Sequence, residues 1–488
     1  MSKKILIMLV AVVTGAFMAS VAVAVDYGDL AYNKRIGPNT TTGQTAGTIL
    51  NPEGKGDALI AAYYDVRVIN NSLGVGKAQD TYFAIINENM DAITHNGVAA
   101  KLRFREWDKS EEVFDIDIWL SDNDVWVGVL TRNPANGLTR IWSPDYIITA
   151  YTGTTLTVSK TTVVSIGSGM DFFTDYVPGG ALNTKSPPTG FTAADLTNMG
   201  YFEIIGEERT YTTPSTTTAP ILVTRITSPN LWDCLNSLSA YVYIVRVDDG
   251  VSLGYNAAAI ANFSRQEVSR LFVGPGDVRP NLKDDAEDGL DQLEFELSKA
   301  RVYHGYSIEN TIYAKFSMIV TFPTKHFHFD HRPNYTLFSP PFTGETANYG
   351  EVVGVTIFDR DEHPYLPESG FWSPRTTPTI SLPWEVNVIG LYSGAVPTVP
   401  VIGNRNNVAW PTGGFLSGWI WIDLYKAVHY ATPVSLNTLW GHLGIDFNRY
   451  NGMPTLSLAL QEFSNANVGG YYGVIFPAFY QVNWVEIP

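Results

Sequence analysis

Hydrophobic and polar residues alternate along several short stretches of the chain, most clearly between residues 56 and 132. In the stretch 112–120, every second residue from Phe114 to Leu120 is apolar, and Asp117 lies between two of them. A period of two is typical of half-buried strands. Five such strands at a spacing of roughly ten residues indicate a meander or Greek-key sandwich. We therefore expect Phe114, Ile116, Ile118 and Leu120 to face a core and Asp117 to face solvent.

Stretches of the same kind continue to the C-terminus, and only 289–300, which follows an acidic run, has a pattern that favours a short helix. We expect an all-β protein of two or three β-sandwich domains, of immunoglobulin-like or jelly-roll type, with long polar loops and very little helix. The predicted strands include Ala58–Val68, Gly200–Glu208, Tyr241–Val247, Thr311–Pro323, Val352–Phe358, Trp384–Tyr392, Gly418–Leu424, Thr455–Phe463 and Tyr471–Phe476.

The first 24 residues have the pattern of a secretory signal peptide. Lys3 and Lys4 precede an apolar run, and Ala22-Val23-Ala24 forms a small-residue cleavage site. We expect cleavage before Val25 and a mature chain that lies outside the cell or at its outer surface, without inserting into a membrane. The predicted organisation is a signal peptide at 1–24, an extended arm at 25–55, a sandwich domain at 56–300 and a second one at 301–488.

Composition narrows the possible partners. The formal net charge is −16, and an acidic chain with few Lys and Arg is a poor ligand for nucleic acid or for anionic membranes. Cys234 is the single cysteine, so no internal disulfide can form. Leu231 and Trp232 lie near it in sequence, which favours a buried thiol.

The arm at 25–55 is polar and rich in Gly, Thr and Asn. One interpretation is a mobile leader. The other is a strand donated to a neighbouring subunit, because an edge strand can be extended by a segment of another chain. Self-association through this arm or through edge strands is therefore the partner that we expect, with surface glycans as a further possibility.

A cluster of histidines is the sharpest local signal for chemistry. His326, His328, Asp330 and His331 have the H-x-H-x-D-H form of zinc-dependent hydrolases, in which bound zinc activates water. On a strand, His326, His328 and Asp330 would share one face and could hold a metal. However, that hydrolase fold needs long helices, which this chain does not predict. We therefore expect no catalytic metal and no cofactor, and at most an adventitious metal site at these four residues.

Aromatic residues and carboxylates offer two further hypotheses. The chain has 12 Trp and 26 Tyr, which either fill sandwich cores or stack on sugars. Trp119, and Trp126 with it, would face outward if the apolar face around Ile116 is buried. The carboxylates Glu111, Glu112, Asp359, Asp361 and Glu362 could pair for glycoside hydrolysis, although charged turns explain them equally well.

Several phrases of the chain carry a resemblance to known sequences. They are GDALIAAYYDVR (56–67), KLRFRE with VFDIDIWLSDNDVWVGVLTR (within 101–132), GYFEII (200–205), GYNAAAIANF (254–263), VTFPTK (320–325), PWEVNVI (383–389) and the ending LALQEF…YYG (458–473). With these phrases the chain resembles a broad family of uncharacterised secreted, β-rich bacterial cell-surface proteins. The resemblance implies export, a β-rich fold and a place at the cell surface, but no activity.

The function that we expect is therefore not enzymatic. The sequence favours a secreted structural or cell-surface protein that assembles into a layer or filament or serves in adhesion. The alternatives are a carbohydrate-binding or glycan-acting protein, and a zinc-dependent hydrolase that uses the histidine cluster.

Overall fold

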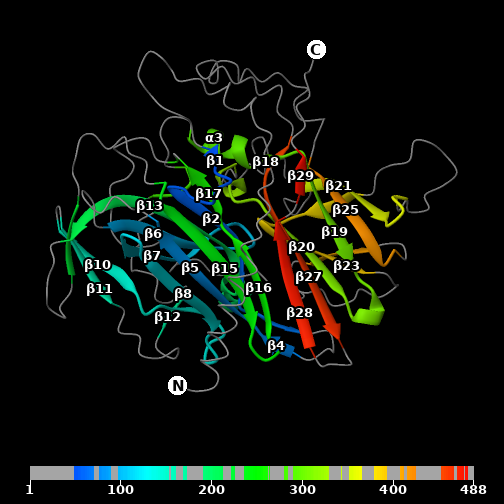
Figure 1. Ribbon diagram of the computed structural model, residues 1–488, viewed down its shortest axis with the longest axis horizontal. Coiled ribbons are helices and arrows are strands. Elements are labelled where there is room, and N and C mark those ends of the chain that lie inside the picture. The colour runs from blue at the N-terminus through cyan, green and yellow to red at the C-terminus, as the bar shows by residue number, and fades with distance from the viewer. Residues whose placement is uncertain are drawn as a thin grey trace, which may run out of the picture. The chain divides into compact units, whose positions relative to one another are not determined.

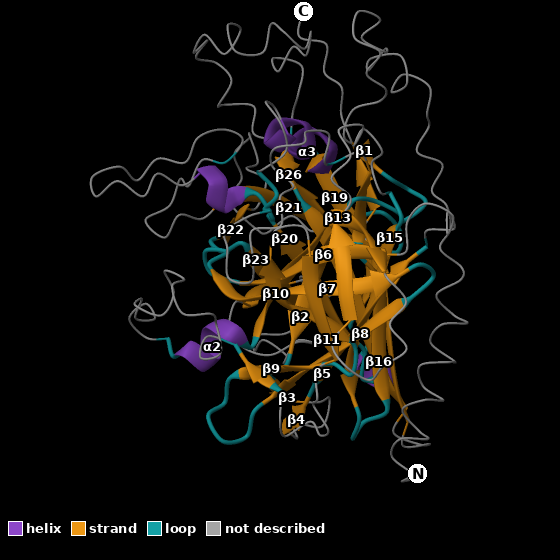
Figure 2. Ribbon diagram, turned by 90° about the vertical axis from the view of Figure 1, so that its left-hand side faces the viewer, coloured by secondary structure: helices purple, strands orange, loops and turns teal. Residues whose placement is uncertain are grey.

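The computed structural model has a chain built almost entirely of strands, which confirms the prediction of an all-β protein (Figures 1 and 2). It divides into two compact units, of which unit 1 contains residues 1–68 and 77–296 and unit 2 contains residues 69–76 and 297–488. The immunoglobulin-like or jelly-roll type stays a prediction. None of the described helices is long and apolar enough to span a membrane. The structure describes residues 49–70, 76–88, 97–152, 155–160, 169–172, 191–212, 221–225, 236–261, 263, 280–283, 289–328, 342, 351–364, 379–392, 407–411, 415–424, 452–465, 470–477 and 479–481.

Unit 1 contains a nine-stranded sheet, in the order β1-β17-β2-β13-β14-β11-β10-β7-β6, and a six-stranded sheet, in the order β12-β9-β8-β5-β15-β16. All of their pairings are antiparallel. The bounds are β1 Ile49–Leu50, β2 Ala58–Asp65, β5 Asp80–Asn87, β6 Gly97–Glu106, β7 Glu112–Ser121, β8 Val125–Arg132, β9 Thr139–Trp142, β10 Tyr146–Thr152, β11 Thr155–Lys160, β12 Met170–Asp171, β13 Met199–Thr212, β14 Ile221–Arg225, β15 Leu238–Arg246, β16 Val251–Asn256, β17 Ala258–Ala261, α2 Ala193–Thr197 and α3 Gly289–Leu297. Two short strands, β3 Val68–Asn70 and β4 Gly76–Ala78, pair with each other.

The core of unit 1 is aromatic and lies between its two sheets. Phe83 on β5, in the six-stranded sheet, packs 4.9 Å from Phe202 on β13, measured between ring centroids. Phe104 on β6 lies 5.1 Å from Phe202 in the same way. Phe114 on β7 is 1% exposed and Leu120 is fully buried. The predicted apolar face of β7 is therefore confirmed, because it closes a sandwich with the second sheet.

The opposite face of β7 is buried as well, and the prediction that Asp117 faces solvent is wrong. Asp115 is 2% exposed and Asp117 is 1% exposed. In the register of β6 and β7, Lys101 pairs with Asp117 and Arg103 with Asp115. The Lys101 Nζ lies 3.1 Å from Asp115 Oδ2 and 3.1 Å from Asp117 Oδ1. Opposite charges on adjacent strands thus neutralise one another inside unit 1.

This burial follows from the way the nine-stranded sheet closes on itself. β6 pairs with β13 as well as with β7, so that β13, β6, β7, β10, β11 and β14 form a closed ring. Trp119 packs within this ring against Ala99, Ile148, Leu156 and Val158. The indole of Trp119 donates a hydrogen bond to Thr210 Oγ1 at 2.9 Å. Trp119 is therefore a core residue and does not face outward as predicted.

Trp126 is also buried, which corrects the second outward prediction. It is 1% exposed and lies 5.8 Å from Phe83, measured between ring centroids. Its indole N–H donates to the carbonyl oxygen of Tyr146 at 3.0 Å. Both tryptophans thus satisfy their single donor inside the protein, as buried indoles usually do.

Unit 2 contains two five-stranded sheets, in the orders β22-β21-β25-β19-β29 and β24-β23-β20-β27-β28, and a two-stranded sheet of β18 and β26. Its pairings are antiparallel except that of β23 with β24. The bounds are β18 Ser298–Lys299, β19 Arg301–Ser307, η3 Asn310–Ile312, β20 Lys315–Thr321, η4 Lys325–His328, β21 Glu351–Asp359, β22 Thr379–Leu382, β23 Val386–Tyr392, β24 Asn407–Pro411, β25 Ser417–Asp423, β26 Met453–Pro454, β27 Leu456–Asn465, β28 Gly470–Pro477 and β29 Phe479–Gln481.

Both five-stranded sheets contribute to one core in unit 2. Val355 on β21 and Ile420 on β25 come from the first sheet, and Met318 on β20 and Ile389 on β23 come from the second; all four are fully buried in the same cluster. The unit is therefore a two-layer sandwich.

The predicted arm and signal peptide lie mostly outside the described residues, which begin at Ile49. The last part of the arm does belong to unit 1. Ile49 and Leu50 form β1, which pairs with Ala261 and Ile260 of β17 at the edge of the nine-stranded sheet. Cys234 also lies outside the described residues.

Candidate functional site

A hollow of about 380 Å³ opens on unit 2, where β19 and β21 end and β25 begins. Strands of both five-stranded sheets contribute to it, because β19, β21 and β25 belong to the first sheet and β27 and β28 to the second. Its lining consists of three aromatic residues, two glycines and four polar residues. The residues are Gly305, Tyr306, Ser307, Arg360, Ser417, Gly418, Trp419, Gln461 and Phe476.

Two exposed aromatic rings form the apolar part of the hollow. Trp419 is 43% exposed and Phe476 is 42% exposed. Along β25 the side chains alternate, so that Ile420 and Ile422 enter the core and Trp419 is left at the surface. Trp421 lies on the same side as Trp419 but is covered, since the guanidinium of Arg301 lies 4.5 Å from its ring centroid. Trp419 is therefore the tryptophan of β25 that a ligand can reach.

Of the two glycines of the hollow, Gly305 leaves room beside Trp419 and Gly418 allows close packing of the strands. Gly305 pairs with Trp419 across β19 and β25, and a Cβ at Gly305 would meet nothing closer than the carbonyl oxygen of Gly418, at 3.8 Å. Gly418 has a φ of 157°, and a Cβ there would lie 1.9 Å from the carbonyl oxygen of Phe358. Only glycine fits at 418, whereas the position of Gly305 would accept a side chain and is open.

Tyr306 contributes to the lining of the hollow, but its side chain points into the core of unit 2. The residue is 4% exposed, and its ring lies 6.1 Å from that of Phe316 in the core. Among the described residues, no hydrogen-bond partner of its hydroxyl is found. Burial, and secondarily the Asp359 carboxylate, raise the pKa of Tyr306 above its ordinary value, so the phenol stays protonated and can both donate and accept. The hydroxyl exposes less than 1 Å², so a ligand in the hollow does not reach it.

Hydrogen bonds fix the polar rim of the hollow. Arg360 Nε donates to Ser417 Oγ at 2.9 Å, and Ser417 Oγ donates to Glu309 Oε1 at 3.1 Å. Arg360 Nη2 lies 3.1 Å from the same Glu309 oxygen. Gln461 connects the two sheets, because its amide donates to the Ser307 carbonyl at 2.8 Å and accepts the Ser307 N–H at 3.0 Å. The guanidinium is thus oriented while its side chain stays 70% exposed.

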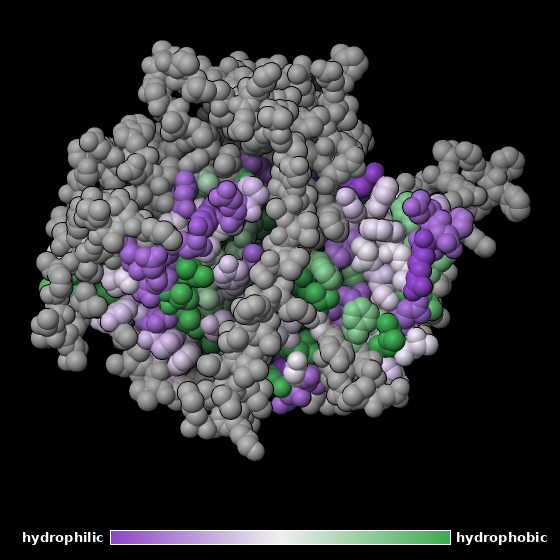
Figure 3. Space-filling view, viewed as in Figure 1, coloured by the Kyte–Doolittle hydropathy of each residue, from purple (hydrophilic) through white to green (hydrophobic). Residues whose placement is uncertain are grey.

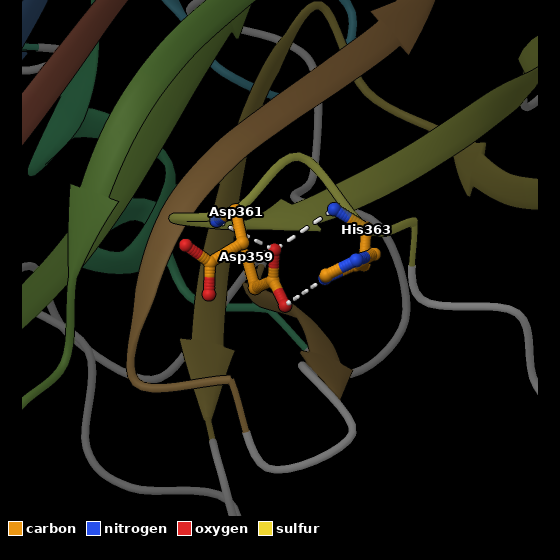
Figure 4. A group of neighbouring side chains, drawn as sticks. All are labelled: Asp359, Asp361 and His363. Carbon is orange, nitrogen blue, oxygen red and sulfur yellow. Dashed lines mark hydrogen bonds and ion pairs between the residues drawn. The ribbon is translucent and has the colours of Figure 1, made fainter.

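Arg360 lies within an acidic turn, of which Figure 4 shows Asp359, Asp361 and His363. Asp359 Oδ1 accepts the backbone N–H groups of Asp361 and His363, each at 2.8 Å, and Oδ2 lies 3.1 Å from His363 Nδ1. The bond from the His363 backbone, together with the others, lowers the pKa of Asp359. The ligand atoms of Asp359, Asp361 and His363 lie within 4.8 Å of one another. The hydrogen bonds explain this cluster as a side-chain-stabilised turn.

The predicted carboxylate pair for glycoside hydrolysis is not supported by this geometry. Asp359 and Asp361 lie in one exposed turn and do not face each other across a cleft. A general acid needs a raised pKa, whereas that of Asp359 is lowered. Glu112 is committed to a salt bridge, with its Oε2 at 2.8 Å from Arg103 Nε.

The histidine cluster does not form the predicted strand. His326 and His328 lie on the 3₁₀ helix η4, and Asp330 and His331 lie outside the described residues. Residues two apart on a 3₁₀ helix point in different directions, because each turn takes three residues. The His328 ring instead lies 5.5 Å from Phe342, measured between centroids. The prediction that His326 and His328 share one face of a strand is therefore wrong.

No motif or spacing in the sequence marks Tyr306, Trp419 or Phe476 as site residues. Trp419 gave one usable signal, since it continues the apolar run of β25 on the side opposite to Ile420 and Ile422. The proximity of Trp419 to Phe476 depends on the packing of the two sheets, so the sequence of neither strand predicts it.

On the face of the molecule seen in Figure 3, hydrophobic and hydrophilic residues are interspersed over the described surface, and small groups of hydrophobic side chains are open to solvent. Such scattered groups are ordinary for a soluble protein. The hollow differs from them because two exposed rings and an oriented guanidinium line one site.

The chain was compared with models of protein families, with curated proteins and with solved structures, and it matches none of them. The resemblance to secreted bacterial cell-surface proteins therefore stays a prediction.

Proposed function

We propose that the protein is a non-catalytic, secreted protein that binds glycans at the cell surface and serves in adhesion, with the hollow of unit 2 as its saccharide site. The observation that carries this proposal is the combination of two exposed rings, Trp419 and Phe476, with the oriented guanidinium of Arg360 in one hollow.

The chemistry of a sugar ring matches this combination. A pyranose has a face of C–H groups that packs on an aromatic ring, while its hydroxyls project sideways and need donors and acceptors. Trp419 offers the ring, and the exposed guanidinium of Arg360 offers N–H donors. Sites that combine an apolar lining with a few placed polar groups are typical for small ligands. The open position of Gly305 gives the ring room to lie against Trp419.

The same groups are poorly suited to catalysis. Burial raises the pKa of Tyr306, so its phenol is not available as a base near neutral pH. The lowered pKa of Asp359 keeps that carboxyl ionised. The site can therefore bind and orient a saccharide, but the described groups offer no acid and base pair for cleaving it.

Saccharide binding can be tested with the mature chain on a glycan array, followed by calorimetry with the best ligand. We expect Trp419→Ala to weaken binding by about tenfold or more, since the stacking surface is lost. Gly305→Leu should do the same by filling the hollow. Leu222→Ala is the matched control, because Leu222 is 53% exposed on β14 in unit 1. Unchanged affinity in both hollow variants would refute the site.

Self-association into a layer or filament is a second candidate, and the sheet edges favour it. Among the described strands, β16 and β28 are each the last of their sheet, and an edge strand presents unpaired backbone groups to another chain. The arm before β1 could add such a strand in a neighbouring copy. A chain that begins at Thr48 keeps β1 and should then lose its multimers in light scattering. A full-length mature chain that is monomeric at high concentration would refute this candidate.

A further inference from the structure

Four ionisable side chains meet inside the closed ring of unit 1. Lys101, Asp115, Asp117 and Glu207 are each at most 2% exposed. The Lys101 Nζ lies 3.1 Å from Asp115 Oδ2 and 3.1 Å from Asp117 Oδ1, and Lys101 is directly opposite Asp117 in the register of β6 and β7. An amine and a carboxyl group are therefore held in contact, on neighbouring strands, where solvent does not reach them.

A β-bulge in β13 brings the fourth group to the same place. The register of β13 with β6 shifts between Gly206 and Glu208, so that Glu207 is an extra residue. Bulges re-aim a side chain and are frequent next to active sites. Burial raises the pKa of Asp117, and the charge of Lys101 and a hydrogen bond with Glu207 only partly offset this. Two carboxyl groups share a hydrogen bond only when one of them holds a proton, so Asp117 and Glu207 have one proton between them.

The four groups have different chemical roles available to them. Lys101 can act as a nucleophile once it loses a proton, whereas the guanidinium of its neighbour Arg103 keeps its protons. Asp115 can take up that proton, because it accepts a hydrogen bond from the Lys101 Nζ and burial raises its pKa to about 6. Asp117, when it holds the proton shared with Glu207, is a neutral acid whose Cγ an amine can attack.

We propose that Lys101 and Asp117 condense to an intramolecular amide, with Glu207 as the acid–base group. The Lys101 ammonium first passes a proton to Asp115 Oδ2. The neutral Nζ then forms a bond to Cγ of protonated Asp117, and the surplus proton of the nitrogen moves to the Glu207 carboxylate. Glu207 returns this proton to the departing hydroxyl, so that the Cγ–O bond breaks and water leaves. The products are an amide, one water molecule and protonated Asp115, and no oxidant or other co-reactant is needed.

Burial favours this product over the ion pair. Charges withdrawn from water carry a large desolvation cost, and condensation replaces two of them by a neutral amide. Trp119, two residues beyond Asp117 on the same face of β7, belongs to an apolar cluster of the ring, which helps to keep out the water that would hydrolyse the amide. The salt bridges of Lys101 are the state of these groups before the reaction.

The amide would join β6 to β7 covalently, so that this hairpin could not separate even where its backbone hydrogen bonds break. Such a bond would strengthen the ring of unit 1 against mechanical load. It is independent of the saccharide site, which lies in unit 2.

Intact mass spectrometry of the folded mature chain tests the proposal directly. The parent should be lighter than its sequence by the mass of one water molecule. Lys101→Arg, which keeps the cation but cannot form the amide, should have the full mass of its sequence. A tryptic digest of the parent should contain one branched peptide that joins residues 78–103 to residues 110–132, and its fragmentation should place the link between Lys101 and Asp117.

The role of Glu207 is tested by the rate of the reaction. The chain is made by cell-free translation and samples are quenched in urea at intervals, since the unfolded chain does not hold the groups together. Glu207→Gln should slow the loss of water about a hundredfold or more. Glu112→Gln is the matched control, because Glu112 pairs with Arg103 and not with Lys101; it should react as the parent does. Circular dichroism shows whether each variant is folded.

Each result bears on one part of the proposal. A folded parent that keeps the full mass of its sequence would refute the amide, and the four groups would then form salt bridges only. A link to Asp115 would refute the assignment of Asp117. Equal rates in the parent and in Glu207→Gln would refute the role of Glu207.

Discussion

Replacing Lys101 by methionine tests the buried charge network of unit 1. Lys101 is 1% exposed, and its ammonium lies 3.1 Å from both Asp115 Oδ2 and Asp117 Oδ1. Burial opposes its charge, but Asp117, Glu207 and Asp115 outweigh this effect and raise the pKa of Lys101. Methionine keeps the length of the side chain and removes the charge, so that two carboxylates lose their shared cation.

The expected loss follows from what these carboxylates can do. Removing one partner from a buried ion pair costs about 3–5 kcal/mol. A stranded carboxylate can instead take up a proton, which at pH 7 costs about 4 kcal/mol relative to an ordinary aspartate and at pH 5 about 1.5 kcal/mol. Burial already raises the pKa of Asp115 to about 6 and that of Asp117 above its ordinary value. We therefore expect Lys101→Met to lower the free energy of unfolding by about 3–5 kcal/mol at pH 7 and clearly less at pH 5.

Urea unfolding of the mature chain would measure this loss of stability. Hydrogen exchange of peptides from β6 and β7 would show that the loss occurs in unit 1. Lys55→Met is the matched control, because Lys55 forms a salt bridge with Glu88 and its side chain is 42% exposed; it should cost about 0.2–1 kcal/mol. The triple variant Lys101→Met/Asp115→Asn/Asp117→Asn should recover much of the loss. A loss below about 1 kcal/mol for Lys101→Met at pH 7 would show that water reaches the carboxylates and would refute the reasoning.

Three further predictions address other parts of the chain. Burial, and then the charge of Asp108, raise the pKa of Glu106 from 4.5 to about 8. The contribution of Glu106 to the free energy of unfolding is therefore complete below about pH 4.5 and is lost as the pH rises through about 8. Urea titrations at several pH values should therefore show Glu106→Gln gaining stability relative to the parent between about pH 5 and 9. Gly128→Ala would place a Cβ 2.2 Å from the ring of Phe83 and should cost about 1–3 kcal/mol in thermal unfolding, since that ring is packed on all sides. Replacing His326 and His328 together by alanine should change the free energy of unfolding by less than about 1 kcal/mol in metal-free buffer and remove any zinc binding measured by calorimetry; a collapse of stability would make the pair a structural element.

The sequence by itself determined the strands and one face of each. The period-two pattern of β7 places Phe114 and Ile118 in the core, because successive side chains of a strand point to opposite faces. The same rule holds for β21, in which Val353, Val355 and Ile357 are buried. Local patterns of this kind need no knowledge of the neighbouring strands.

The tertiary structure decided what covers the other face. Asp117 and Trp119 look exposed in the sequence, but β13 and the strands of the ring enclose them. The alternating cations of β6 and the aspartates of β7 do indicate this burial in the sequence, because charged side chains that pair across two strands can be buried together. To predict which cation meets which aspartate, one needs the register of β6 and β7, which depends on the hairpin that connects the two strands.

The candidate site could not be predicted from the sequence. Tyr306, Trp419 and Phe476 come from β19, β25 and β28, and only the packing of two sheets brings them to one hollow. The histidine motif, in contrast, is compact in sequence but lies partly on a 3₁₀ helix, which separates His326 from His328. Spacing along the chain predicts a site only when the local backbone is known. Here the sequence determined which residues alternate, and the tertiary structure decided which of them meet, because contacts between distant strands depend on register and layer packing.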